Sequence, residues 1–238
     1  MTEIQNYLLD IEGTVCPITF VKDELFPFFL KALPSLLSKY QYPLQHNDSD
    51  AALQTLSKFP EDLTESYDKI LAHLNDLVAR DIKDPLLKQL QGLVWQAGYD
   101  SGEIKCPVYE DAIIAINRWT SEGKKVFIYS SGSVKAQKLL FGHTLENGKS
   151  VDLNPLISGY FDTLNAGMKN ETTSYTKILE ETGLTAENVL FLSDNVNEVR
   201  AAFDSGMHSI IVCRPGNAEL SEDDRNKFKS IDDFSGLV

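Results

Sequence analysis

The sequence predicts an α/β protein in which a parallel sheet is interrupted once by an all-helical insert. Four short, mostly apolar runs have the composition of buried strands and lie at residues 7–9, 126–129, 189–192 and 209–212. Helical patterns separate the last three runs, and this alternation is typical of a parallel sheet covered by helices on both faces. No strand pattern occurs between Pro17 and Glu103, which defines the insert.

The insert begins with the apolar spacing of an amphipathic helix. Apolar residues recur every three or four positions from Val21 to Tyr40. Pro27 and Pro34 lie inside this pattern, and a proline in a helix removes a backbone hydrogen-bond donor. We therefore expect the first helix of the insert to be irregular or broken.

Two further helical patterns complete the insert, at residues 67–78 and 87–94. We expect residues 17–104 to form this all-helical unit. Residues 1–16 and 105–238 are expected to come together as the core that contains the sheet.

Helix and strand patterns alternate after the insert. Helical spacing covers residues 110–120, 134–140 and 173–182. Gly123 and Gly183 suit the C-terminal ends of the first and third helices, and Ser133 suits the N-cap of the second.

Composition excludes several classes of partner. The chain has 238 residues and a formal net charge of -13, which argues against nucleic-acid binding because that function needs a basic face. Its apolar stretches are too short to span a bilayer, and residues 1–6 lack the basic and apolar regions of a signal peptide. The three cysteines show no metal-ligand spacing and suggest reduced thiols. We expect a cytoplasmic protein and leave nuclear presence open.

Polar and acidic residues follow three of the predicted strands. Asp10, Ser130 and Asp194 stand at or next to the carboxyl ends of these strands. Ligands of parallel sheets bind at that edge. Three such ends, two of which bring a carboxylate, predict a functional site.

Asp10 is the candidate nucleophile of this site. A carboxylate can attack phosphorus and divide a hydrolysis into two easier displacements. Gly13 allows a sharp bend after the strand, and the Thr14 hydroxyl can orient a carboxylate. Glu12 can protonate a leaving oxygen and then activate water. The alternatives are a solvated turn aspartate and a simple loop glutamate.

Asp194 is the second strand-end carboxylate, and its approach to Asp10 would be repulsive unless a cation lay between them. Oxygen ligands of this kind suit Mg²⁺. Glu198 follows one helical turn later. It either supports the metal site from outside, for instance through a metal-bound water, or is an ordinary acid in the first turn of a helix.

A chain with a net charge of -13 repels anions, so phosphate binding needs local hydrogen-bond donors or a cation. The loop that contains Ser130 and Ser131 opens a helix, where hydroxyls and backbone N–H groups can hold a phosphate. Chemistry alone does not single out Lys169, because most lysines are solvated.

These residues resemble the four motifs of the haloacid dehalogenase-like phosphatases. The matching segments are Asp10-Ile11-Glu12-Gly13-Thr14, Ser130-Ser131, Lys169 and Ser193-Asp194. Within that group the chain is similar to the enolase-phosphatase family of methionine salvage. That similarity rests on Glu12, where most relatives have Asp, on residues 90–99 and 129–143, and on Arg214-Pro215-Gly216-Asn217.

The resemblance covers nearly the whole chain and implies a Rossmann-like core with a helical cap inserted after the first strand. It implies one Mg²⁺ per subunit, held by Asp10, Asp194 and the Glu12 position. It implies a substrate held by Ser130, Ser131 and Lys169.

The implied reaction starts from 2,3-diketo-5-methylthiopentyl-1-phosphate, a small phosphorylated diketone. The substrate is enolised and then dephosphorylated, through an aspartyl-phosphate on Asp10, to the acireductone 1,2-dihydroxy-3-keto-5-methylthiopentene. We expect the enzyme to act on it as a monomer.

Two segments depart from the family pattern. The stretch from Thr144 to Gly159 is longer than in many relatives and is expected to be a surface loop. Cys106-Pro107 stands where relatives often have Gly-His. Neither segment includes a motif residue.

Three other functions compete with this one. A dehalogenase would leave Glu12 and Asp194 without a task, because halide departs without a proton or a metal. A phosphatase for another small phosphate ester shares the core motifs. A non-catalytic module would not need an intact Asp10, Glu12, Lys169 and Asp194 set. Two details stay open: whether Glu12 also removes the C1 proton, and whether Trp95 and Tyr99 line the cap or pack in its core.

Overall fold

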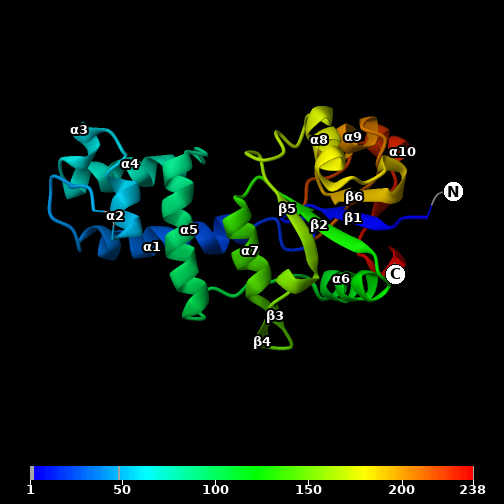
Figure 1. The fold of residues 1–238 in the computed structure, drawn as a ribbon, viewed down its shortest axis with the longest axis horizontal. Helices are drawn as coiled ribbons and strands as arrows, with labels where there is room; N and C mark the ends of the chain where they lie inside the picture. The colour runs from blue at the N-terminus through cyan, green and yellow to red at the C-terminus, as the bar shows by residue number, and fades with distance from the viewer. Residues whose placement is uncertain (1–2, 48, 238) are drawn as a thin grey trace. The chain divides into compact units, whose positions relative to one another are not determined.

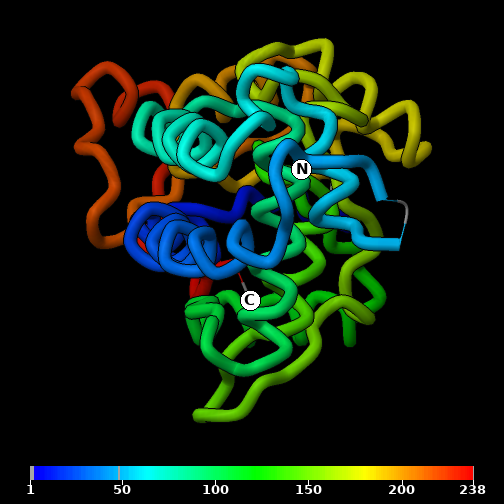
Figure 2. The backbone as a smooth tube through the Cα atoms, turned by 90° about the vertical axis from the view of Figure 1, so that its left-hand side faces the viewer, coloured from blue at the N-terminus to red at the C-terminus, as the bar shows by residue number. Residues whose placement is uncertain are grey.

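The computed structural model describes residues 3–47 and 49–237, which form two compact units. The helical unit is Val21–Ile104, and the sheet unit combines the chain up to Phe20 with the chain from Lys105 onward. The chain enters the helical unit once and leaves it once, a path that can be followed in Figures 1 and 2. The first division therefore falls after Phe20, whereas the sequence pattern placed it after Cys16.

A six-stranded parallel sheet forms the centre of the sheet unit, with the order β5-β2-β1-β6-β7-β8. The strands are β1 (Asn6–Leu9), β2 (Lys125–Tyr129), β5 (Ile157–Phe161), β6 (Val189–Ser193), β7 (His208–Val212) and β8 (Ser230–Ile231). β1 lies between β2 and β6, and Leu9 pairs with both Ile128 and Leu192. This register brings the carboxyl ends of the three central strands to one edge.

Helices cover both faces of this sheet, as Figure 1 shows. On one face, Tyr175 and Ile178 of α8 (Thr172–Thr182) and Ala202 of α9 (Val196–Asp204) share a core with Leu8 and Phe191 of the sheet. On the other face, Trp119 of α6 (Glu110–Ser121) stacks on Tyr7, with ring centroids 3.6 Å apart. Alternate strand residues thus face opposite helical layers, which explains the continuous apolar runs.

The helical unit contains no strand among its described residues. Its elements are a π-helical turn at Val21–Leu25, α1 (Phe26–Leu37), α2 (Ala51–Leu56), α3 (Glu61–Thr64), α4 (Tyr67–Ala79) and α5 (Pro85–Asp100). The expected irregularity is that π-helical turn, before Pro27 in the first turn of α1. Pro34 lies inside α1 without ending it, so the expected break does not occur there.

The expectation of a surface loop from Thr144 to Gly159 is wrong. After α7 (Val134–Gly142), the chain forms a hairpin of β3 (Thr144–Glu146) and β4 (Lys149–Val151), then begins the edge strand β5. Asn147 and Gly148 take positive φ angles of 49° and 77°, the backbone of a tight hairpin turn for which Asn-Gly is the favoured pair.

The smaller elements of the sheet unit are short and polar, and the sequence pattern did not predict them. They are three 3-10 turns at Asn154–Leu156, Ala186–Asn188 and Ser235–Leu237, and the helix α10 (Glu222–Lys227).

Candidate active site

Asp10 lies at the end of β1 and is only 6% exposed. Its backbone N–H donates to the Leu192 carbonyl at 2.9 Å, which extends the sheet pairing by one residue. Its carboxylate accepts hydrogen bonds from the Ile11 N–H, from the Ser193 hydroxyl at 3.0 Å and from the Lys169 ammonium. The sheet therefore fixes the backbone of Asp10, and three donors from separate parts of the unit fix its side chain.

Lys169 is the cation of this cluster, and its side chain is 8% exposed. Its ammonium forms ion pairs with Asp10 and, at 2.7 Å, with Glu198. Burial by itself would lower the pKa of Lys169, but the two carboxylates outweigh burial and raise the pKa above its ordinary value. Lys169 therefore stays charged, and its charge is held at the Asp10 carboxylate.

Three hydroxyl groups hold the backbone that carries Lys169. The Tyr129 hydroxyl donates to the Gly167 carbonyl at 2.8 Å, and the Ser174 hydroxyl donates to the Met168 carbonyl at 2.7 Å. The Tyr175 hydroxyl donates to the carbonyl of Lys169 itself at 2.7 Å. The sequence pattern gave none of these hydroxyls a role, because they belong to β2 and α8 and meet the lysine loop only in the folded chain.

Asp194 approaches the backbone of the turn after β1. A Cβ at Gly13 would lie 2.6 Å from Asp194 Oδ2, and Gly13 has a φ of +71°, so both space and backbone require glycine here. The Thr14 hydroxyl accepts a hydrogen bond from the Asp194 N–H at 3.1 Å. The Gly13-Thr14 pair thus brings the second strand-end carboxylate against the first loop.

Asp194 has a pKa raised to about 7, first by burial and then by the negative charges of Asp10 and Glu198. When all are ionised, these three carboxylates face the single positive charge of Lys169, which leaves two negative charges in excess. This imbalance fits a bound cation. The described residues contain no group of three or more metal-ligating side chains, so a cation here would need further oxygen ligands from backbone, water or substrate. Mg²⁺ binds in that way.

Glu198 lies in the first turn of α9 and contacts the lysine directly. The Ser193 hydroxyl lies 2.9 Å from the Glu198 carboxylate and 3.0 Å from that of Asp10. Its single proton can serve only one of them at a time. Burial and the charge of Asp10 raise the pKa of Glu198. The Glu198 carboxylate therefore pairs with Lys169 and lies within hydrogen-bond distance of Ser193.

The serine loop after β2 is placed at the same edge of the sheet. The Ser130 N–H donates to the Phe161 carbonyl at 3.1 Å, and Ser130 is 5% exposed, whereas Ser131 is exposed. Ser133 caps α7 by accepting from the Ala136 N–H at 3.3 Å. Asp162 accepts from the Val134 N–H at 3.0 Å, so it holds the start of that helix.

Glu12 lies in the turn directly after the nucleophile candidate and is partly exposed. A β-bridge joins Glu12 to Cys16, and the backbone N–H groups of Thr14, Val15 and Cys16 all donate to the Ile11 carbonyl. This tight turn keeps Glu12 two residues from Asp10 with its backbone fixed.

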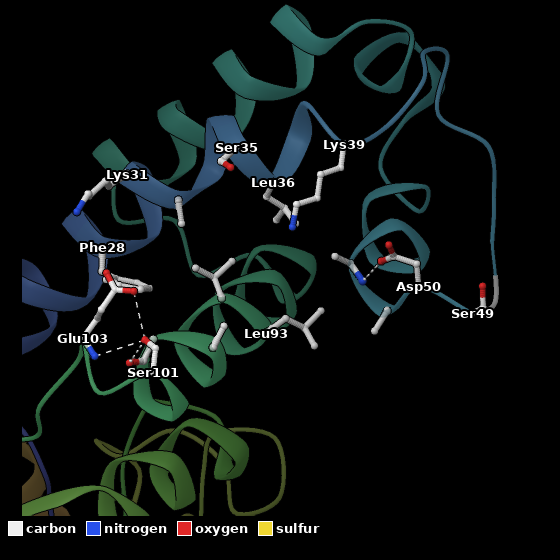
Figure 3. Close-up of a pocket in the computed structure, with 16 residues that line it drawn as sticks. Phe28, Lys31, Ser35, Leu36, Lys39, Ser49, Asp50, Leu93, Ser101 and Glu103 are labelled. Atoms are coloured by element: carbon white, nitrogen blue, oxygen red, sulfur yellow. Dashed lines mark hydrogen bonds between the residues drawn. The ribbon is translucent and has the colours of Figure 1, made fainter. Parts of the chain in front are cut away.

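A separate pocket of about 860 Å³ lies within the helical unit (Figure 3). Phe28, Lys31, Lys39 and Leu93 are among the residues that line it, and none of the predicted site residues does. Trp95 and Tyr99 are buried in this unit, and the Trp95 ring N–H donates to the Leu25 carbonyl at 2.9 Å. These contacts correspond to the packing alternative for Trp95.

Comparison with known proteins defines the class first. The family of haloacid dehalogenase-like hydrolases matches residues 4–206. The structure of CbbY from Rhodobacter sphaeroides in complex with phosphate shares the fold, with a TM-score of 0.59 at 16% identity over 98% of this chain and 96% of that one. Fold and family match make the chain a hydrolase of the haloacid dehalogenase-like class.

Closer relatives narrow the class. Enolase-phosphatase E1 of Scheffersomyces stipitis is 56% identical to this chain, and the matched region covers 98% of this chain and 99% of that protein. Enolase-phosphatase E1 of Candida tropicalis is 52% identical over 99% of both chains. The crystal structure of the UTR4 protein from Saccharomyces cerevisiae is 46% identical, with a TM-score of 0.84 over 98% of this chain and 99% of that one. The chain belongs to the enolase-phosphatase family.

No helix in the described part of the chain has both the length and the apolar character needed to cross a membrane.

Proposed function

We propose that the protein is an enolase-phosphatase that converts 2,3-diketo-5-methylthiopentyl-1-phosphate into the acireductone 1,2-dihydroxy-3-keto-5-methylthiopentene and phosphate. The observation that carries the phosphatase half is the buried Asp10 carboxylate held by Lys169 and Ser193 beside Asp194. The choice of substrate rests on the 56% identity to a named enolase-phosphatase over nearly the whole chain.

Asp10 acts as the nucleophile in this proposal. One carboxylate oxygen attacks phosphorus, the bond from phosphorus to the substrate oxygen breaks, and an aspartyl-phosphate forms. Water then attacks the same phosphorus and releases phosphate, which regenerates the carboxylate. Because Lys169 and Ser193 fix the side chain, little motion is needed before attack.

Asp10 and Asp194 would hold Mg²⁺, together with the Glu12 position. When bound, the cation would neutralise negative charge of the carboxylates and polarise the phosphoryl group. The placement of the partly buried Asp194 carboxylate against the loop after Asp10 supports this assignment, and burial together with the negative charges of Asp10 and Glu198 raises the pKa of Asp194.

Lys169, Ser130 and Ser131 bind the phosphoryl group in this proposal. Lys169 already lies at the nucleophile, so its charge is placed where negative charge develops during transfer. The serine loop provides hydroxyls and backbone N–H groups at the start of α7. Together they offset the repulsion that a net charge of -13 imposes on an anionic substrate.

Glu12 donates a proton to the leaving oxygen and later receives one from the attacking water. Enolisation needs a base for the C1 proton as well. Either Glu12 is this base, or a residue of the helical unit or a water molecule takes the C1 proton, and exchange of that proton with deuterated solvent in Glu12→Gln tests the role of Glu12.

The helical unit serves as the cap that excludes water during enolisation in this proposal. We further propose that the enzyme works as a monomer in the cytoplasm. Light scattering at the concentration of the assay tests the monomeric state, and fractionation of cells tests the cytoplasmic location.

The decisive assay supplies the diketone phosphate and follows enol absorbance and free phosphate together. We expect both signals in the wild-type protein with Mg²⁺, and their loss in EDTA. Asp10→Asn keeps the shape of the side chain and removes the nucleophile, so phosphate release should fall by about three to six orders of magnitude. Near-normal phosphate release by that variant would refute the role of Asp10.

A further inference from the structure

The turn from Arg214 to Asn217, directly after β7, has no part in the reaction as described so far. The Asn217 N–H donates to the Arg214 carbonyl at 3.1 Å, and Gly216 between them has a φ of +88°. This turn fixes two side chains that both reach back to the loop after β1. Nearly two hundred residues separate the two segments in the chain.

Arg214 is 7% exposed and uses its guanidinium as a set of donors. Its Nε donates to the Thr14 carbonyl at 3.0 Å. Its two terminal nitrogens donate to the Asp111 carboxylate at 3.1 and 2.7 Å. The rings of Tyr109 and Phe234 lie 4.4 and 5.0 Å from Cζ, measured to their centroids. Because Asp111 neutralises the charge of Arg214, the interaction between Arg214 and the loop after β1 is a directed hydrogen bond.

Asn217 holds the neighbouring carbonyl. Its side-chain amide nitrogen donates to the Gly13 carbonyl at 2.8 Å and to the Val212 carbonyl at 3.1 Å. Its amide oxygen is buried and has no hydrogen-bond partner in the described part of the chain. If the amide were flipped, its oxygen would face the carbonyls of Gly13 and Val212 and both hydrogen bonds would be lost. The side chain therefore keeps its oxygen as a buried acceptor without a partner and donates to both carbonyls.

The two carbonyls belong to the residues that position Asp194. Gly13 is the residue against which the Asp194 carboxylate packs, and the Thr14 hydroxyl accepts from the Asp194 N–H. Asp10 lies three residues before Gly13 in the same tight turn. A shift of these two peptide groups would therefore change the position of Asp194 relative to Asp10.

We propose that Arg214 and Asn217 are positioning residues that set the separation of the Asp10 and Asp194 carboxylates, and through it the affinity of the site for its cation. They act through the hydrogen bonds that they donate to the carbonyls of Thr14 and Gly13. The inference rests on the proposed function, because it takes these two carboxylates as the cation site. Neighbours of metal ligands that act in this way typically contribute a factor of about 10–100 to affinity.

Direct binding of Mn²⁺, followed by loss of the electron paramagnetic resonance signal of the free ion, tests this proposal without turnover. Asn217→Ala removes two hydrogen bonds and no charge, and Arg214→Lys keeps the charge but cannot reproduce the fork of donors. We expect the Mn²⁺ dissociation constant to rise at least about tenfold in each. Ile116→Val is the control, since it loosens the buried core under α6 in the same unit without touching the loop.

The outcomes separate positioning from simple stabilisation. A purely structural role would lower the melting temperature of the two variants, as in Ile116→Val, and leave the Mn²⁺ dissociation constant of the folded protein unchanged. That result would overturn the inference. Unchanged Mn²⁺ binding in Asp194→Asn would instead overturn the proposed cation site, and the inference with it.

Discussion

The helical unit and the sheet unit treat charge in opposite ways. In the described part of the helical unit, no Asp, Glu, Lys, Arg or His side chain is buried, and its buried polar groups include the side chains of Thr55, Thr64 and Gln91 and the phenol of Tyr99. Its ion pairs, such as Arg80 with Asp76, have both side chains more than half exposed. The sheet unit buries Asp10, Lys169 and Arg214. The described core of the helical unit thus holds no charged side chain, whereas the core of the sheet unit holds several.

This difference indicates that the sheet unit accepts a cost in folding free energy in order to keep charged groups at its candidate site. Burying charge costs free energy unless partners are well placed, and replacing a buried pair by apolar groups is often neutral or stabilising. A contribution to stability is therefore a weak explanation for the buried charges of Asp10, Lys169 and Glu198. A catalytic role for a preformed charge cluster explains its location at the carboxyl ends of three parallel strands.

The largest effect is expected when one charge of that cluster is removed. Lys169→Met would leave Asp10 and Glu198 buried without their cation, which should lower the free energy of unfolding by about 3–5 kcal/mol. Turnover should fall by a factor of about 10²–10³ or more, because the donor at the developing charge is lost. Urea unfolding and the phosphate-release assay measure the two effects.

The matched variant in the helical unit is Lys69→Met. Lys69 pairs with Glu65 at the surface, with side chains 52% and 63% exposed. We expect no measurable change in unfolding or in turnover, since exposed pairs contribute little. Equal destabilisation by the two lysine variants would refute the contrast between the units.

A smaller effect is expected from pH in the metal-free protein. Asp194 releases its proton near pH 4 when unfolded but only near its raised pKa of about 7 when folded. The folded state therefore binds more protons between these values, and stability falls as the pH rises through about 7. In EDTA, the wild type should lose on the order of 3 kcal/mol relative to Asp194→Asn between about pH 4 and about pH 8.

Saturating Mg²⁺ should remove most of that pH dependence, because a cation at Asp194 favours the ionised carboxylate. If the stability of the wild type and of Asp194→Asn changes in parallel over the same pH range, Asp194 does not titrate as the structure indicates.

The smallest effect is expected from alanine substitutions at two glycines, which separate the cost of a left-handed backbone from the cost of a steric clash. Gly13 and Gly183 have similar φ angles of +71° and +66°, but a Cβ at Gly183 would have open space around it. Alanine at either position should cost about 1–2 kcal/mol for the left-handed backbone. Only Gly13→Ala should also displace Asp194 and weaken activation by Mg²⁺, which a titration of activity against Mg²⁺ would show. An unchanged activation constant in Gly13→Ala would contradict the close approach.

Much of this architecture follows from local sequence signals. The apolar runs at β1, β2, β6 and β7 predict the central strands, because strands buried on both faces need such runs. β5 has no apolar-run signal, because Ser158 and Gly159 interrupt its apolar character at the edge of the sheet. The hairpin before it does carry a local signal, the Asn147-Gly148 pair of its turn.

The site was predictable in part. The strand-end carboxylates follow from topology, and Lys169 was found through family resemblance alone. The hydroxyls of Tyr129, Ser174 and Tyr175 that hold the lysine loop have no local signal, because each serves the site through a tertiary contact. Positions of this kind need the folded structure.

The proposed reaction requires that Asp10 become phosphorylated during turnover. The direct measurement quenches the enzyme with acid while it is consuming the diketone phosphate, reduces the acyl phosphate with borohydride and sequences the peptides by mass spectrometry. We expect homoserine at position 10 in the wild type and none in Asp10→Asn. Reduction at another carboxylate, or an unmodified Asp10 under conditions of steady turnover, would contradict it.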